Sequence, residues 1–159
     1  AVSSIPFSHR VIAYQAALCD MVKTVEILRR SPEYARIVDE EEAVIITELG
    51  YVSRWLEKWA PESLKFRLAD EVNPDGFSPE QKEYLRRLAD DIAEAPAGAD
   101  GNWFHQAIYA YKESGLLPPR ELFTTIYRVL IGKDSGPSAG WFLSILPRDW
   151  LIERLRLVK

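Results

Sequence analysis

Apolar residues recur at steps of three and four positions along nearly the whole chain of 159 residues. The clearest case places six of them on one stripe of a long helix, or of two helices broken near Asp20: Val11, Tyr14, Leu18, Met21, Val25 and Leu28. This spacing is the period of an amphipathic α-helix, and no segment shows the alternation typical of a half-buried strand. We therefore predict an all-α protein, a multi-helix cage or bundle of about seven to eight helices.

A second helical stripe lies between residues 41 and 59 and is unusually wide. Its members are Ile45, Leu49, Val52, Leu56 and Trp59, with Val44, Tyr51 and Trp55 beside them. Such width indicates a helix that is buried on most sides, so we expect Trp55 and Trp59 to be core residues. Gly50 interrupts this helix and lowers its helix propensity, which suggests a close backbone contact at that position.

Two loops divide the rest of the chain. Residues 72–81 contain turn residues followed by Ser78-Pro79-Glu80-Gln81, a capping box that predicts a helix start. Residues 95–102 form the second loop, and they could separate two lobes, 1–95 and 102–159, of a single domain covering 1–159. Further helices are predicted at 102–114, from Pro118 or Pro119 to Ile131, at 137–146 and at 148–157.

The sequence GKDSGPSAGWF, residues 132–142, resembles a phosphate-binding loop at first sight. Its spacing does not fit a nucleotide-binding P-loop, because Tyr127 stands where a glycine is needed and Asp134 follows Lys133. Gly132 instead fits a left-handed helix C-cap, and Pro137 fits the first turn of the next helix. A helix start beside Lys133 and Ser135 could also hold one phosphate oxygen.

Charge is distributed unevenly around a formal net charge of −4. Residues 116–159 contain seven basic and four acidic residues, a net charge of +3, and residues 1–115 carry −7. The overall acidity argues against non-specific nucleic-acid binding, so we expect no DNA partner, and a polyanion should meet the C-terminal third.

Several other classes of site are not supported by the sequence. The two histidines lie far apart and there is one cysteine, so we expect no metal site and a cytoplasmic location. No apolar run reaches the length of a membrane span, and no serine-protease-like or hydrolase motif is present. The residues alone therefore predict no active site in this chain.

One predicted surface does suggest a ligand. His105, Tyr109 and Lys112 follow each other at helical steps on the 102–114 helix, beside a core side formed by Phe104, Ala107, Ile108 and Tyr111. Aromatic rings with cations between them are typical of proteins that bind single-stranded RNA loops. The alternative is that Tyr109 only packs with its hydroxyl at the rim, while His105 and Lys112 are merely exposed.

Three blocks of sequence resemble a known family. They are IPFSHRVI (5–12), YVSRWLEKWAPESLKF (51–66) and LFTTIYRVLIGKDSGPSAGWFLSIL (122–146), in this order. Over nearly its whole length the chain resembles the C-terminal helical domain of the class I lysyl-tRNA synthetases. In that family an all-helical cage receives the tRNA anticodon stem-loop, and a separate catalytic half uses ATP to make lysyl-adenylate.

The resemblance implies an RNA-binding module for tRNA-Lys that acts as a monomer, with no cofactor in this chain and ATP in the catalytic half. The HIGH-like and KMSKS-like motifs of that half are not present, so this chain alone should not activate lysine. The RNA-facing residues are predicted to be His105, Tyr109, Lys112, Arg128, Lys133 and Ser135. The alternative is a helical protein-interaction domain derived from the same cage, which the acidic first 115 residues would suit.

Overall fold

The computed structural model describes residues 2–157, so Ala1 and the last two residues, including Lys159 of the basic third, lie outside the described residues. Within 2–157 the chain forms eight α-helices, two short 3-10 helices and no strand, which confirms the all-α prediction. The 3-10 helices are η1 (Glu62–Leu64) and η2 (Pro74–Gly76). The chain divides into two compact units, Ala1–Arg67 and Leu68–Lys159.

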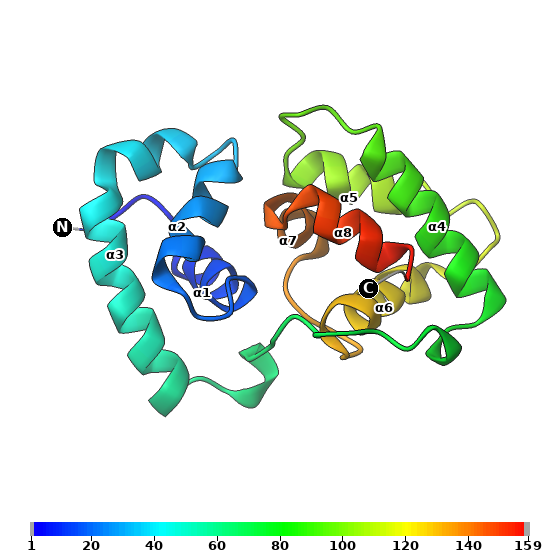
Figure 1. Ribbon diagram of the computed structural model, residues 1–159, viewed down its shortest axis with the longest axis horizontal. Helices are drawn as coiled ribbons and strands as arrows, with labels where there is room; N and C mark the ends of the chain where they lie inside the picture. The colour runs from blue at the N-terminus through cyan, green and yellow to red at the C-terminus, as the bar shows by residue number, and fades with distance from the viewer. Residues whose placement is uncertain (1, 158–159) are drawn as a thin grey trace. The chain divides into compact units, whose positions relative to one another are not determined.

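The first unit contains three helices, α1 (Phe7–Ala16), α2 (Met21–Arg30) and α3 (Ala35–Lys58), each packed against the other two (Figure 1). Their buried apolar residues follow the predicted period closely: Val11, Tyr14, Val25, Leu28, Ile45, Leu49, Val52 and Leu56. The core of this unit is therefore the meeting point of three amphipathic stripes.

The first apolar stripe, from Val11 to Leu28, belongs to two helices with a break near Asp20 and not to one long helix. This is one of the two arrangements that the sequence predicts. Leu18 and Cys19 have left-handed φ angles of 54° and 63°, so α1 cannot continue into α2. Asp20 then caps α2, because its carboxylate accepts a hydrogen bond from the Lys23 backbone N–H at 2.9 Å. Leu18, which the pattern assigned to the buried stripe, is exposed at this turn.

The C-terminal half of α3 differs from the prediction of a helix buried on most sides. Trp59 is 76% exposed and Tyr51 is 61% exposed, and Trp55 is half-buried. The prediction that both tryptophans are core residues is therefore wrong, since α1 and α2 cover one stripe of α3 and leave the neighbouring aromatic stripe at the surface. Gly50 makes no close contact either, because a Cβ built there would meet no atom within 4 Å.

The second unit contains five helices: α4 (Pro79–Ala93), α5 (Gly101–Tyr109), α6 (Pro119–Ile131), α7 (Ala139–Ile145) and α8 (Arg148–Leu155). In this unit α8 packs against α4 and α6, while α5 packs against α4 and α7 (Figure 1). The boundary between the units lies at 67/68, upstream of the 95–102 loop that the sequence offered as a possible division between two lobes. Because α4 packs on α5 and α8, that loop connects helices of the same unit.

Local signals in this unit were predicted well. Ser78 and Gln81 form the expected capping box at the start of α4, with hydrogen bonds of 3.1 and 2.9 Å between side chains and backbone. Pro119 opens α6, and Gly132 ends it with a left-handed φ of 68°. These features depend on a few neighbouring residues, which is why the sequence identifies them.

A buried arginine joins the start of this unit to its last helix. Arg154 of α8 is 1% exposed, and its Nη1 and Nη2 groups donate hydrogen bonds to the carbonyl oxygens of Ala69 at 2.7 Å and Asp70 at 3.1 Å. The Ala69 backbone N–H in turn donates to the Leu130 carbonyl oxygen of α6 at 2.9 Å. The segment that opens the unit is thus fixed against both α6 and α8.

Candidate nucleic-acid interface

Two glycines set the position of His105. A Cβ built on Gly140 of α7 would lie 2.5 Å from the Gly101 carbonyl oxygen and 2.9 Å from the His105 Cβ. A Cβ on Gly101 would lie 3.1 Å from the Trp141 Cα. Because neither approach leaves room for a side chain without movement, the backbones of α5 and α7 are in direct contact. His105 is therefore placed by backbone packing rather than by a flexible contact.

His105 and Tyr109 do lie together, and a third ring joins them. The centroids of the His105 and Tyr109 rings are 4.5 Å apart, and the Phe123 ring of α6 lies 5.6 Å from Tyr109 and 6.4 Å from His105. Tyr109 is 44% exposed, while His105 and Phe123 are half-buried. We refer to His105, Tyr109 and Phe123 as the aromatic cluster, whose rings remain partly accessible for stacking.

Phe123 was not identified from the sequence. Phe123 lies beside the buried stripe of α6, which includes Leu122, Ile126 and Val129. A large ring outside the buried stripe is the sequence signal that could have identified Phe123 as a surface residue. The helical period alone does not show that this ring faces α5.

Lys112 departs from the predicted stripe. Helix α5 ends at Tyr109, five residues before the predicted end at Ser114, and Lys112 lies in the following turn, where its backbone N–H donates to the Tyr109 carbonyl oxygen at 2.9 Å. Lys112 is exposed, so a contact with a phosphate is open to it. It does not continue the helical row formed by His105 and Tyr109.

An open hollow of about 770 Å³ lies beside the aromatic cluster. It brings Phe123 together with Ser135 of the elbow between α6 and α7, and its lining is Pro118, Arg120, Glu121, Phe123, Thr124, Asp134 and Ser135. Arg120 can bind a phosphate, whereas the Glu121 and Asp134 carboxylates suit the N–H groups of a base edge and repel phosphate. The lining therefore offers a ring, a cation and hydrogen-bond acceptors in one place.

The elbow differs from the predicted helix start near Pro137. Helix α7 begins at Ala139, and both Ala139 and Gly140 are buried. The Tyr127 hydroxyl donates to the Pro137 carbonyl oxygen at 2.6 Å and accepts from the Ala139 backbone N–H. Burial raises the pKa of Tyr127, and the Ala139 hydrogen bond opposes that rise. Tyr127 therefore occupies the Ala139 backbone N–H, and a phosphate contact at this helix start stays a prediction.

Several basic residues of the C-terminal third already have partners within the protein, and Arg156 pairs with Asp90. Arg128 donates to the Gly76 carbonyl oxygen at 2.7 Å, with its guanidinium 5.1 Å from the Phe77 ring centroid, and therefore holds the η2 turn against α6. Arg148 similarly donates to the Ala95 carbonyl oxygen at 3.0 Å, and Arg154 is buried. These three arginines bind the protein's own backbone, so the charge count overstates the cations that a polyanion would meet. A contact of Arg128 with RNA stays a prediction.

Arg120 and Lys133 are exposed near the aromatic cluster and the elbow. Arg120 lines the hollow, and Lys133 directly follows Gly132, whose left-handed backbone turns the chain out of α6. Lys133 and Ser135, both predicted from the sequence, thus lie on the same short elbow as Asp134.

The described residues show neither a metal site nor a membrane span. Among residues 2–157 no group of three or more His, Cys, Asp or Glu side chains is arranged to hold a metal ion. In the same part of the chain no helix is both long and apolar enough to cross a bilayer.

No protein-family model matches the chain. Curated proteins to which it is similar include lysine–tRNA ligases. A lysine–tRNA ligase of Archaeoglobus fulgidus is 29% identical over 154 residues, which cover 97% of this chain and 30% of that protein. Lysine–tRNA ligase 1 of Methanosarcina acetivorans is 33% identical over 96% of this chain and 31% of its own length. A lysine–tRNA ligase of Thermoplasma acidophilum is 35% identical, covering 87% of this chain and 28% of its own length.

The chain thus spans about 30% of the length of the curated relatives that it matches. An all-helical domain that aligns almost completely with one part of several aminoacyl-tRNA synthetases is a domain of that class of protein. By this similarity the chain corresponds to the C-terminal helical domain of the class I lysyl-tRNA synthetases.

Proposed function

We propose that this chain is a tRNA-binding module that receives the anticodon stem-loop of tRNA-Lys. The observation that carries the proposal is the aromatic cluster of His105, Tyr109 and Phe123, which lies beside a hollow lined by Arg120 and Ser135. Anticodon loops present unpaired bases, and aromatic rings with cations nearby are the usual means of binding such bases.

The relatives support tRNA as the partner, because each is named a lysine–tRNA ligase. We propose that the full-length protein joins lysine to tRNA-Lys with ATP, in the cytoplasm, and that the chemistry takes place outside the matched 30% of its length. The role of this chain is then to hold the RNA. On its own it should give no lysine-dependent pyrophosphate exchange.

We assign stacking, phosphate binding and hydrogen bonding to different residues according to their chemistry. Tyr109 and Phe123 offer partly exposed rings for stacking, and His105 supports the Tyr109 ring at 4.5 Å. Lys112, Arg120 and Lys133 are exposed cations for phosphate oxygens. Ser135 and the neighbouring Asp134 can form hydrogen bonds with a base edge in the hollow.

The test is a comparison of tRNA-Lys with an unrelated tRNA in a gel-shift titration at low salt. The proposal predicts tighter binding of tRNA-Lys, and it predicts that Phe123→Leu weakens this preference while Phe123→Tyr keeps it. The leucine variant keeps an apolar side chain of similar size, so the comparison isolates the ring. Equal or absent binding of both RNAs would contradict the proposal and favour the protein-interaction alternative.

A further inference from the structure

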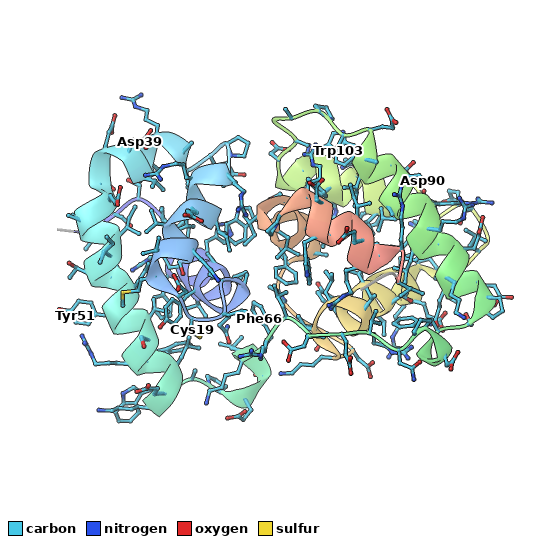
Figure 2. The ribbon with its side chains drawn as sticks, in the orientation of Figure 1. Cys19, Asp39, Tyr51, Phe66, Asp90 and Trp103 are labelled. Atoms are coloured by element: carbon cyan, nitrogen blue, oxygen red, sulfur yellow. The ribbon has the colours of Figure 1, made fainter. Side chains whose placement is uncertain are left out.

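The first unit carries a row of three aromatic rings outside its core, two of which are exposed. Tyr51 and Trp55 lie one turn apart on α3, and Trp59 directly follows the helix as its C-cap; we refer to these three residues as the aromatic stripe. Figure 2 shows Tyr51 projecting outward from α3. Tyr51 and Trp59 are exposed and Trp55 is half-buried, beside a buried row formed by Leu49, Val52 and Leu56. The two exposed rings are not needed to fold this unit.

The stripe is held in place from α1. The Phe7 ring meets the Trp55 ring edge to face, with centroids 5.0 Å apart. One turn further, Arg10 of α1 forms an ion pair with Glu48 of α3 at 2.6 Å, and both side chains are largely buried. These contacts fix the register of α1 on α3, so Trp55 is presented from a rigid support.

Cations interleave with the rings on the same side of α3. Arg54 and Lys58 are both exposed, and the Arg54 guanidinium lies 4.7 Å from the Tyr51 ring centroid. At 3.6 residues per turn, Lys58 lies roughly 20° and Glu57 roughly 120° around the helix from Tyr51. Glu57 therefore points away from the stripe, and Glu48, on the stripe's side of α3, is already paired with Arg10.

The spacing of the rings suits bases. Residues four apart on a helix are separated by about 6 Å along its axis. This is close to twice the roughly 3.4 Å rise between stacked bases in a strand, so consecutive rings leave room for a base beside each of them. Exposed aromatic residues and arginines are also common where proteins dock, so it is the two cations beside the rings, together with this spacing, that favour RNA.

We propose that the aromatic stripe is a second RNA-binding surface, which stacks unpaired nucleotides on Trp59 and Tyr51 while Arg54 and Lys58 bind their phosphates. This proposal rests on the proposed function because the ligand is again RNA. The aromatic stripe, however, lies in the first unit, whereas the aromatic cluster lies in the second. The two surfaces can therefore fail independently.

The experiment measures the affinity of the 159-residue chain for a fluorescein-labelled anticodon stem-loop RNA of tRNA-Lys over a series of salt concentrations. Trp59→Ala should weaken binding about tenfold and leave the salt dependence unchanged, since a stacking contact releases no counterion. Trp59→Phe is the matched control and should bind within about threefold of wild type, because the ring is kept. Lys58→Ala should weaken binding and reduce the slope of log K against log salt concentration by about 0.7 to 0.9.

A second measurement locates the RNA directly, by ultraviolet cross-linking of the same RNA carrying 4-thiouridine in its loop. Cross-links within residues 51–59 would support the proposal, and cross-links confined to residues 68–157 would overturn it. Unchanged affinity of Trp59→Ala, with an unchanged melting temperature, would also overturn it and is the outcome expected if the stripe docks a protein. If Phe123→Leu still weakens binding in that case, the proposed function stands without the second surface. Absence of RNA binding by the wild-type chain would overturn both.

Discussion

Gly140 and His105 approach each other so closely that a Cβ on Gly140 would lie 2.9 Å from the His105 Cβ. The same Cβ would lie 2.5 Å from the Gly101 carbonyl oxygen, which is backbone and cannot rotate away. Gly140→Ala should therefore push α7 away from α5 and reduce the free energy of unfolding by about 1–3 kcal/mol. Thermal unfolding followed by circular dichroism would show this as a melting temperature lower by several degrees.

Gly50→Ala is the matched control, because Gly50 also lies within a helix but a Cβ there would meet nothing within 4 Å. Replacing this glycine by alanine should raise the free energy of unfolding by about 0.5–1 kcal/mol, through better helix propensity. An equal or higher melting temperature for Gly140→Ala would contradict the close packing of α5 on α7.

Arg154 should be among the residues on which the second unit depends most. Its guanidinium is buried and donates to the carbonyl oxygens of Ala69 and Asp70. Arg154→Met keeps much of the apolar volume but leaves both carbonyl oxygens without their charged donor, so the free energy of unfolding should fall by about 1.5–3 kcal/mol. Chemical denaturation with guanidinium chloride measures this loss.

Arg156 provides the comparison for Arg154, because it is exposed and pairs with Asp90 at 2.9 Å. Arg156→Met should change the free energy of unfolding by less than about 1 kcal/mol. Equal effects of the two substitutions would show that the Arg154 hydrogen bonds contribute little.

The first unit should lose stability as the pH falls through the neutral range. Burial lowers the pKa of His9 below its ordinary value of 6.5, with Glu33 acting in the opposite direction. The unfolded chain therefore takes up this proton at a higher pH than the folded chain does, and the contribution of neutral His9 is complete above pH 6.5 and lost as the pH falls below it. The His9 Nδ1 lies 2.5 Å from the Tyr34 hydroxyl oxygen, and protonation would prevent Nδ1 from accepting a hydrogen bond there.

Melting temperatures at pH 7.5 and 5.5 would measure the effect in the wild type and in His9→Gln. The glutamine cannot titrate, so the difference between the two pH values should be smaller in the variant. A larger difference in His9→Gln would contradict the assignment.

The predicted RNA contacts of Lys133 and Tyr109 can be separated by their dependence on salt. Lys133→Ala should weaken binding of all tRNAs alike and reduce the slope of log K against log salt concentration, because one phosphate contact is lost. Tyr109→Ala should weaken binding with little change in that slope, because stacking does not release counterions. A fall in the melting temperature of Tyr109→Ala, without loss of affinity, would show that Tyr109 acts by packing.

The sequence predicted best those features that depend on adjacent residues. Pro119 opens α6 and Gly132 closes it, because a proline tolerates the first turn of a helix and a glycine tolerates a left-handed backbone. The break near Asp20 and the capping box at Ser78 follow from equally local chemistry. His105 and Tyr109 share a surface for the same reason, since a four-residue step is one helical turn.

Features that depend on distant parts of the chain were missed. The period of α3 shows which residues share a side, but it does not show how many helices cover that side, and Trp59 is consequently exposed. Phe123 joins the aromatic cluster only because α6 lies near α5 in the folded unit. Arg128 and Arg148 count as positive charges in the sequence, but in the fold both donate hydrogen bonds to backbone carbonyl oxygens.

The most direct test of the account is the affinity of this chain for the anticodon stem-loop of tRNA-Lys, measured by fluorescence anisotropy at low salt with a stem-loop of scrambled loop sequence as competitor. We predict tight binding that the scrambled RNA displaces poorly, and a loss of about tenfold in Phe123→Ala, which removes one stacking ring from the aromatic cluster. Equal competition by both RNAs, or an affinity that Phe123→Ala leaves unchanged in a folded protein, would contradict the account.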